Sequence, residues 1–219
     1  MPSTDPAGGG PARRGRHRPA RSSRSFDGPV PGTPADLTPD AEPEAVARTI
    51  ALRKLTAAPR TRAQLADALA RGGVPDDVAD ATLGRFEDLG LVDDAEFARQ
   101  WARTRQAGRG LARRALAHEL RQRGVDGELV QETLDDPELG DELETARTLA
   151  RRRLAPVRDR LADPLERERQ LRRVLGMLAR KGYGAGVAGR AVREALAETE
   201  TETDELADLQ PDLEHLNGD

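Results

Sequence analysis

One pattern occurs three times in this chain and constrains its fold more than any other feature: a helix, a glycine, an apolar residue and a second helix. The three copies read LADALARGGVPDDVADATL (65–83), LAHELRQRGVDGELVQETL (116–134) and VLGMLARKGYGAGVAGRAV (174–192). Their turn glycines, Gly73, Gly124 and Gly182, are separated by 51 and 58 residues. Apolar residues stand eight and four positions before each glycine, and one and five positions after it. This spacing predicts two helices joined by a tight turn.

The glycine of each turn has a structural role in this prediction. A helix commonly ends next to a residue of positive φ, which glycine adopts without Cβ strain. The apolar residue that follows is expected to fold back on the last turn of the helix. Basic residues stand just before the glycines, where they suit the negative end of the helix dipole. They are Arg71, Arg123 and Lys181.

A further amphipathic helix precedes each helical pair, so every unit contains three helices. Thr61 and Gln64 have the spacing of a capping box at the start of one of them. The sequence therefore predicts an all-α fold of three tandem three-helix repeats, at 42–91, 92–137 and 138–197. One unit buries little apolar surface and would be marginally stable alone. Neighbouring units are expected to pack end to end as an elongated or curved solenoid-like rod.

The two ends of the chain differ from the repeats in composition. Residues 1–41 are rich in Arg, Pro and Gly, and residues 198–219 are acidic; both segments are predicted to be disordered. The N-terminus lacks the apolar centre of a secretory signal, and no run of about 18 to 20 apolar residues would span a membrane. Together with the absence of cysteine, these features predict a soluble protein of the cytoplasm. We also expect the chain to be a monomer.

Motifs of catalysis and metal binding are missing from the sequence. The chain has three histidines and no cysteine, so a His-based triad, a His-based metal site and a Cys-based zinc site all lack their parts. His118 is expected at the surface of a charged helix. The acidic pairs at 76–77 and 93–94 are expected to cap helices. We therefore predict no catalytic residue, no cofactor and no metal.

Aromatic residues make up 2% of the chain, so the few that occur carry information. Phe97 and Trp101 lie one helical turn apart and would suit stacking on bases. The favoured interpretation is that they anchor the second repeat. Tyr183 takes the position of the apolar residue after a turn glycine, so its ring is expected to be packed and its hydroxyl to face water.

Arginine-rich segments are the strongest functional feature of the sequence. Residues 97–123 contain eight Arg and one acid, and residues 145–197 contain fourteen Lys or Arg and five acids. Some of these cations are expected to do no more than solvate helices. The remainder predict a basic surface that attracts a phosphate backbone or an acidic protein groove. The candidate partner-facing or DNA-facing residues are Arg103, Arg105, Arg109, Arg113, Arg114, Arg121, Arg123, Arg167, Arg172, Arg173 and Lys181.

Four segments give the chain a family likeness. They are TRAQLADAL (61–69), LGLVDDAEFARQW (89–101), RTRQAGRGLARRALAHELRQRGV (103–125) and LARKGY (178–183). In these segments, and over about 45–197 as a whole, the chain resembles the RecX family, the regulators of the RecA recombinase. The order of acidic pair, aromatic residue, basic helix and glycine turn makes the likeness specific.

The resemblance implies tandem three-helix repeats and a binding function without a catalytic residue. Proteins of this kind bind RecA filaments on single-stranded DNA, lie along the helical groove and damp ATP hydrolysis and strand exchange. The basic faces of repeats two and three are expected to dock in that groove. The rival hypothesis is a helical nucleic-acid-binding module that acts by competing for single- or double-stranded DNA.

Overall fold

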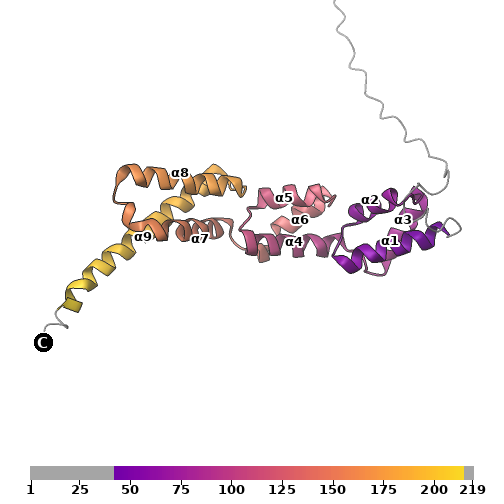
Figure 1. The fold of residues 1–219 in the computed structure, drawn as a ribbon, viewed down its shortest axis with the longest axis horizontal. Coiled ribbons are helices and arrows are strands. Elements are labelled where there is room, and N and C mark those ends of the chain that lie inside the picture. Colours follow the sequence, from indigo (N-terminus) through magenta and orange to yellow (C-terminus); the bar gives the residue numbers. More distant parts are fainter. Residues whose placement is uncertain (1–41, 215–219) are drawn as a thin grey trace, which may run out of the picture.

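The computed structural model describes residues 42–214, which form an elongated row of three helical repeats (Figure 1). Repeat one contains α1 (Pro43–Ala57), α2 (Arg62–Arg71) and α3 (Asp76–Asp88). Repeat two contains α4 (Asp94–Arg109), α5 (Arg113–Gln122) and α6 (Gly127–Asp135). A short 3₁₀ helix, η1 (Pro137–Leu139), leads to repeat three, with α7 (Glu142–Leu154), η2 (Ala155–Arg160), α8 (Pro164–Arg180) and α9 (Ala185–Glu214). The predicted all-α fold of tandem three-helix repeats is confirmed.

The last helix is longer than the sequence pattern predicted. Disorder was expected from residue 198, whereas α9 continues to Glu214. Its continuation, 198–214, contains five Glu and three Leu, which have high helix propensity, and extending an existing helix is far easier than nucleating a new one. The predicted disorder of 1–41 and of 215–219 lies outside the described residues.

The three repeat turns share one backbone geometry. Gly73, Gly124 and Gly182 have φ values of 76°, 79° and 94°. The apolar residue after each glycine donates its N–H to the carbonyl five residues earlier, at 3.1, 3.2 and 3.1 Å in chain order. These bonds satisfy helix-end carbonyls that would otherwise lack a partner. The third helix of each repeat therefore starts at the same position relative to the end of the second helix.

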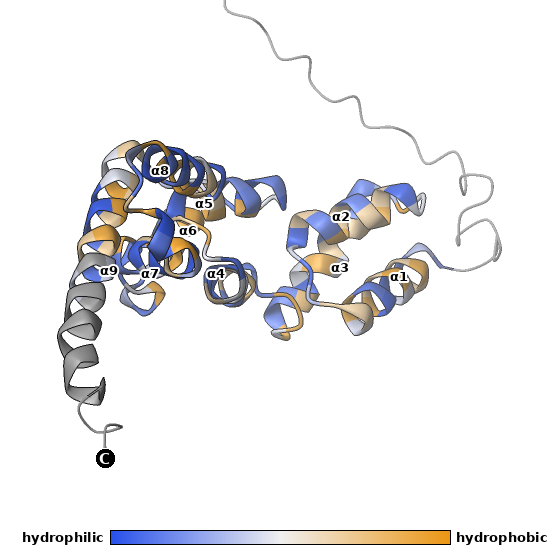
Figure 2. Cartoon of the chain, turned by 60° about the vertical axis from the view of Figure 1, so that its left-hand side comes forward, coloured by the Kyte–Doolittle hydropathy of each residue, from blue (hydrophilic) through white to orange (hydrophobic). Residues whose placement is uncertain are grey.

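Each repeat has a core of its own, built mainly from leucine and alanine (Figure 2). The hydrophobic residues lie on the helix faces that point toward one another within a repeat. The largest fully buried side chains include Leu65, Leu69, Leu83, Leu116, Leu120, Leu154 and Leu178. Full burial of one leucine stabilises the fold by about 1.5 to 3 kcal/mol. The few leucines in each small core therefore supply much of the stability of that repeat.

Repeats one and two meet end to end through a turn glycine. The Thr61 hydroxyl, at the start of α2, donates to the Arg123 carbonyl, at the end of α5, over 2.6 Å. A Cβ on Gly124 would lie 2.3 Å from the Cβ of Ala63. Glycine is thus required here both by its positive φ and by the helix packed against it.

Repeats two and three meet in the same way. The Ala112 N–H, at the start of α5, donates to the Lys181 carbonyl, at the end of α8, over 3.0 Å. A Cβ on Gly182 would lie 2.8 Å from the Cβ of Ala115. At the first joint the end of α5 meets the start of α2, and at the second joint the end of α8 meets the start of α5. The second helices of the three repeats, α2, α5 and α8, therefore form a single row (Figure 1).

Polar contacts reinforce both joints. Between repeats one and two, the Arg62 N–H donates to Asp94 Oδ1 over 2.8 Å, and burial raises the pKa of this carboxyl against the effect of that bond. Between repeats two and three, the Tyr183 hydroxyl donates to the Gly110 carbonyl over 3.1 Å. Tyr183 is 5% exposed, so the expectation of a solvent-facing hydroxyl was wrong. The hydroxyl is buried because the preceding repeat supplies its acceptor.

Candidate basic partner-binding surface

The only tryptophan of the chain organises the arginines of repeat two. Trp101 stacks on Phe97, with ring centroids 5.8 Å apart, and its indole N–H donates to the Glu119 carboxylate over 3.0 Å. The guanidinium carbon of Arg105 lies 4.1 Å from the ring centroid, and that of Arg123 lies 3.6 Å from it. Such contacts combine cation–π attraction with charge pairing. Trp101 is therefore a structural anchor, as the sequence suggested.

Arg105 and Arg123 are committed to this cluster. Arg105 Nε lies 3.4 Å from the Glu119 carboxylate, and Arg123 Nη1 donates to the Glu119 carbonyl over 2.8 Å. Their side chains are 24% and 23% exposed. Burial lowers the pKa of Arg123, Glu119 raises it and Arg105 lowers it further. Both candidate residues therefore present little free charge to a partner.

Two further candidates of repeat two also have partners within the chain. Arg103 pairs with Glu138 and lies 3.7 Å from the Asp136 carboxylate. Arg113 donates through Nη2 to the Gly140 carbonyl over 3.3 Å. These contacts join α4 and α5 to the segment that leads into repeat three.

Three candidates of repeat two remain outward-facing. Arg109, Arg114 and Arg121 are exposed. Among the residues whose side chains are described, no carboxylate lies within 4.0 Å of their guanidinium nitrogens. Arg114 and Arg121 stand seven residues apart on α5, so they share one helix face. His118 lies between them and is exposed, as predicted.

The candidates of repeat three differ in exposure. Arg172 and Arg173 are exposed on α8, and Arg172 pairs with Glu168. Arg167 is half-buried and has contacts of its own. Lys181 is half-buried, and its ammonium donates to the Arg109 carbonyl across the joint. Lys181 thus acts partly as a structural residue of the joint.

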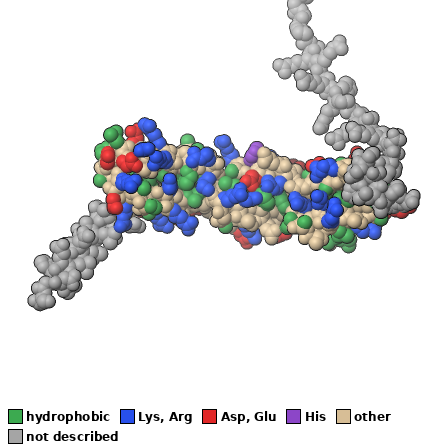
Figure 3. All heavy atoms as spheres, in the orientation of Figure 1, with side chains coloured by type: hydrophobic (Ala, Val, Ile, Leu, Met, Phe, Trp, Pro, Cys, Tyr) green, Lys and Arg blue, Asp and Glu red, His purple; other side chains and the backbone are tan. Residues whose placement is uncertain are grey.

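Basic side chains form an extended surface along the rod. On the face in Figure 3, Lys and Arg side chains lie over repeats three and two and continue onto part of repeat one. An open groove at the joint of repeats two and three is lined by cations, carboxylates and apolar groups, among them Arg109, Arg152, Lys181, Glu138, Glu144 and Leu149. Cationic and apolar groups side by side suit a protein or nucleic-acid partner better than a small-molecule substrate.

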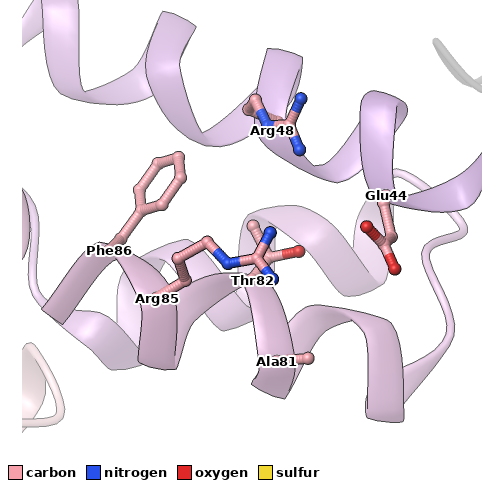
Figure 4. A pocket seen from close by; sticks show the side chains of 6 residues that line it. All are labelled: Glu44, Arg48, Ala81, Thr82, Arg85 and Phe86. Atoms are coloured by element: carbon pink, nitrogen blue, oxygen red, sulfur yellow. The ribbon is translucent and has the colours of Figure 1, made fainter. Parts of the chain in front are cut away.

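Repeat one contains a small hollow between α1 and α3 (Figure 4). Arg48 on α1 and Arg85 on α3 face the gap, beside Glu44 and the buried ring of Phe86. The lining also includes the Thr82 hydroxyl, and it contains no histidine that could activate this group as a base. Within residues 42–214, no cluster of three or more His, Cys, Asp or Glu would hold a metal ion, and no helix is long and apolar enough to cross a membrane.

Comparison with known proteins gives two matching family models. Residues 47–86 match the first three-helix domain of RecX, and residues 93–134 match the second. The regulatory protein RecX of Thermobifida fusca is 52% identical over 188 residues, which cover 85% of this chain and 96% of that protein. The regulatory protein RecX of Streptomyces lividans is 48% identical over 170 residues, covering 78% and 88%.

Solved structures show the same architecture. A crystal structure of RecX from Lactobacillus salivarius superposes with a TM-score of 0.60 at 19% sequence identity. The superposition covers 70% of this chain and 96% of that one. At this level of identity the likeness concerns the fold.

Proposed function

The chain belongs to the RecX family of regulatory proteins, and we propose that it binds RecA filaments on single-stranded DNA and inhibits them. In this proposal the rod lies in the helical groove of the filament and contacts more than one RecA subunit. A filament held in this way cannot rearrange freely, so ATP hydrolysis and strand exchange slow down. The activity is regulatory and located in the cytoplasm, and it needs no catalytic group.

The observation that carries the proposal is the extended rod with outward-facing arginines on successive repeats. Binding modules that are linked rigidly raise one another's effective concentration, so modest contacts on repeats two and three add up to useful affinity. Arginine is also well suited to paired hydrogen bonds with carboxylates and phosphates.

The proposed contact surface is narrower than the arginine content of the sequence suggests. Arg103, Arg105, Arg113 and Arg123 have partners inside the chain. The exposed trio formed by Arg109, Arg114 and Arg121 is therefore our candidate contact in repeat two.

An assay of RecA ATP hydrolysis on single-stranded DNA tests the proposal. We expect the full chain to lower the rate in a concentration-dependent manner. We expect R109E/R114E/R121E to raise the half-inhibitory concentration at least tenfold with unchanged helicity. The matched control is R48E/R53E/R71E, which makes the same charge change at exposed positions of repeat one and should retain inhibition.

Two results would contradict this proposal. Absence of inhibition by the unmodified chain would count against the RecX-type function itself. Equal loss of inhibition in both triple variants would indicate that net charge, and not the repeat-two surface, determines binding.

A second candidate function is competition for DNA by a nucleic-acid-binding helical module. The exposed arginines of repeat three favour it. This reading predicts DNA affinity that falls steeply with salt when RecA is absent, because neutralised phosphates release counterions.

A further inference from the structure

An open pocket on repeat three is lined by four arginines. Arg153 comes from the last turn of α7, and Arg172, Arg173 and Arg180 come from α8. All four residues are exposed. Two helices thus bring four guanidinium groups to one hollow, and two of these arginines, Arg153 and Arg180, were not among the candidate site residues.

The positive charge of this pocket has little compensation within the chain. Arg172 pairs with the exposed Glu168, which is a weak surface pair. Of the carboxylates whose positions are described, none lies within 4.0 Å of a guanidinium nitrogen of Arg153, Arg173 or Arg180. Because like charges held together repel one another, an anion that enters this pocket is bound favourably.

Gly176 and Met177 complete the lining. A Cβ added to Gly176 would meet only the far end of the Arg180 side chain, at 3.4 Å. A glycine inside a helix lowers helix stability, and nothing packed against Gly176 requires it. Its place in the arginine pocket leaves room for a ligand close to the backbone of α8.

We propose that this pocket binds phosphate groups of a single-stranded nucleic acid backbone. Guanidinium groups bind phosphate oxygens through paired, charge-assisted hydrogen bonds. The lining has no aromatic ring on which a base would stack, so recognition concerns the phosphates and is independent of sequence. A single strand can bend its phosphates into a hollow, whereas a duplex is stiff over about 150 base pairs.

This inference deepens the proposed function, because it adds a contact with the DNA inside the filament. It does not depend on RecA, so the two proposals can fail separately. The pocket also explains why repeat three carries arginines that no carboxylate neutralises.

The test uses Gly176→Glu in the full chain, with Gly176→Gln as the matched control. Both side chains favour a helix over glycine, so both variants should fold, which circular dichroism checks. Binding is measured by the anisotropy of a labelled oligo-dT without RecA. We expect Glu to weaken the affinity at least tenfold, because it places a carboxylate among the arginines, and Gln to change it less than threefold.

A second variant, R173A/R180A, measures the phosphate contacts directly. Removal of two such contacts should reduce the slope of log affinity against log salt by about 1.4, at about 0.7 for each phosphate of a single strand. Unmodified chain that inhibits RecA but binds no oligo-dT overturns this inference and leaves the proposed function intact. Equal affinities of the Glu and Gln variants, or an unchanged slope, also overturn it. Displacement of the DNA by tripolyphosphate at equal phosphate concentration would assign the pocket to small polyphosphates instead.

Discussion

Repeats two and three are both rich in arginine, yet they use these residues differently. In repeat two, Glu119 holds Arg105 and Arg123 against Trp101, and Glu138 pairs with Arg103. In repeat three, Arg173 and Arg180 line an open pocket without a described carboxylate within 4.0 Å. One cluster stabilises the fold, and the other is available to a partner.

The difference shows that a local count of charges does not measure free charge. Residues 97–123 have a single acid, but that acid binds three side chains, and η1 and the turn before it supply further carboxylates. Residues 145–197 have five acids, but among the described carboxylates Glu168 alone pairs with an arginine of the pocket, Arg172. The fold determines which carboxylates lie beside which arginines. Two segments of similar arginine content therefore form surfaces that differ in free positive charge.

The largest expected effect concerns the frame that both repeats share. Gly124→Ala and Gly182→Ala should each lower the free energy of unfolding by about 3 kcal/mol, since each combines an unfavourable positive φ with a clash against the neighbouring repeat. Gly90 has a φ of 66° and nothing within 4 Å of an added Cβ. Gly90→Ala should therefore cost only about 1 to 2 kcal/mol. Urea unfolding curves give the three free energies. Equal losses for the three variants would mean that the clash with the neighbouring repeat adds nothing to the cost of the positive φ.

The next effect separates the two arginine clusters. Glu119→Ala should destabilise the chain by about 2 kcal/mol, because it leaves the Trp101 N–H without its acceptor and removes the carboxylate that balances the charge of Arg105 and Arg123. The bond from Arg123 to the backbone carbonyl of residue 119 remains. Glu168→Ala removes an exposed partner of Arg172 and should cost less than about 0.5 kcal/mol. Urea midpoints followed by fluorescence of the single tryptophan report both changes. Similar losses for the two variants would remove the distinction between a structural and a free cluster.

The same contrast explains how much the sequence was able to predict. The three repeats, their glycine turns and the Thr61 capping box follow from local spacing, and the structure contains them. The second role of Thr61, as a donor to Arg123 across a joint, depends on residues 62 positions apart in the chain. Such partners become visible only once the repeats are stacked. For the same reason, the pairing of Arg105 and Arg123 and the gathering of Arg153 with Arg180 were not predictable from the sequence.

The smallest effect concerns Tyr183, whose hydroxyl makes a hydrogen bond across the joint between repeats two and three. Tyr183→Phe should cost about 1 kcal/mol at neutral pH, the usual value of one buried hydrogen bond. Burial, with a smaller effect of Glu142, raises the pKa of the phenol to about 12, above its ordinary value of 10.0.

The pH dependence gives this last prediction a second measurement. Because the pKa is higher in the folded state, the unfolded chain loses the phenolic proton first as the pH rises. The stabilisation by Tyr183 is therefore fully present below pH 10 and is lost progressively as the pH rises toward 12. Tyr183 is the only tyrosine, so phenolate absorbance titrates this group alone, and the Phe variant should lose less stability than the parent chain over the same pH range. A phenol that titrates near its ordinary pKa would show that the hydroxyl is open to water. The joint between repeats two and three would then be looser than the joint between repeats one and two.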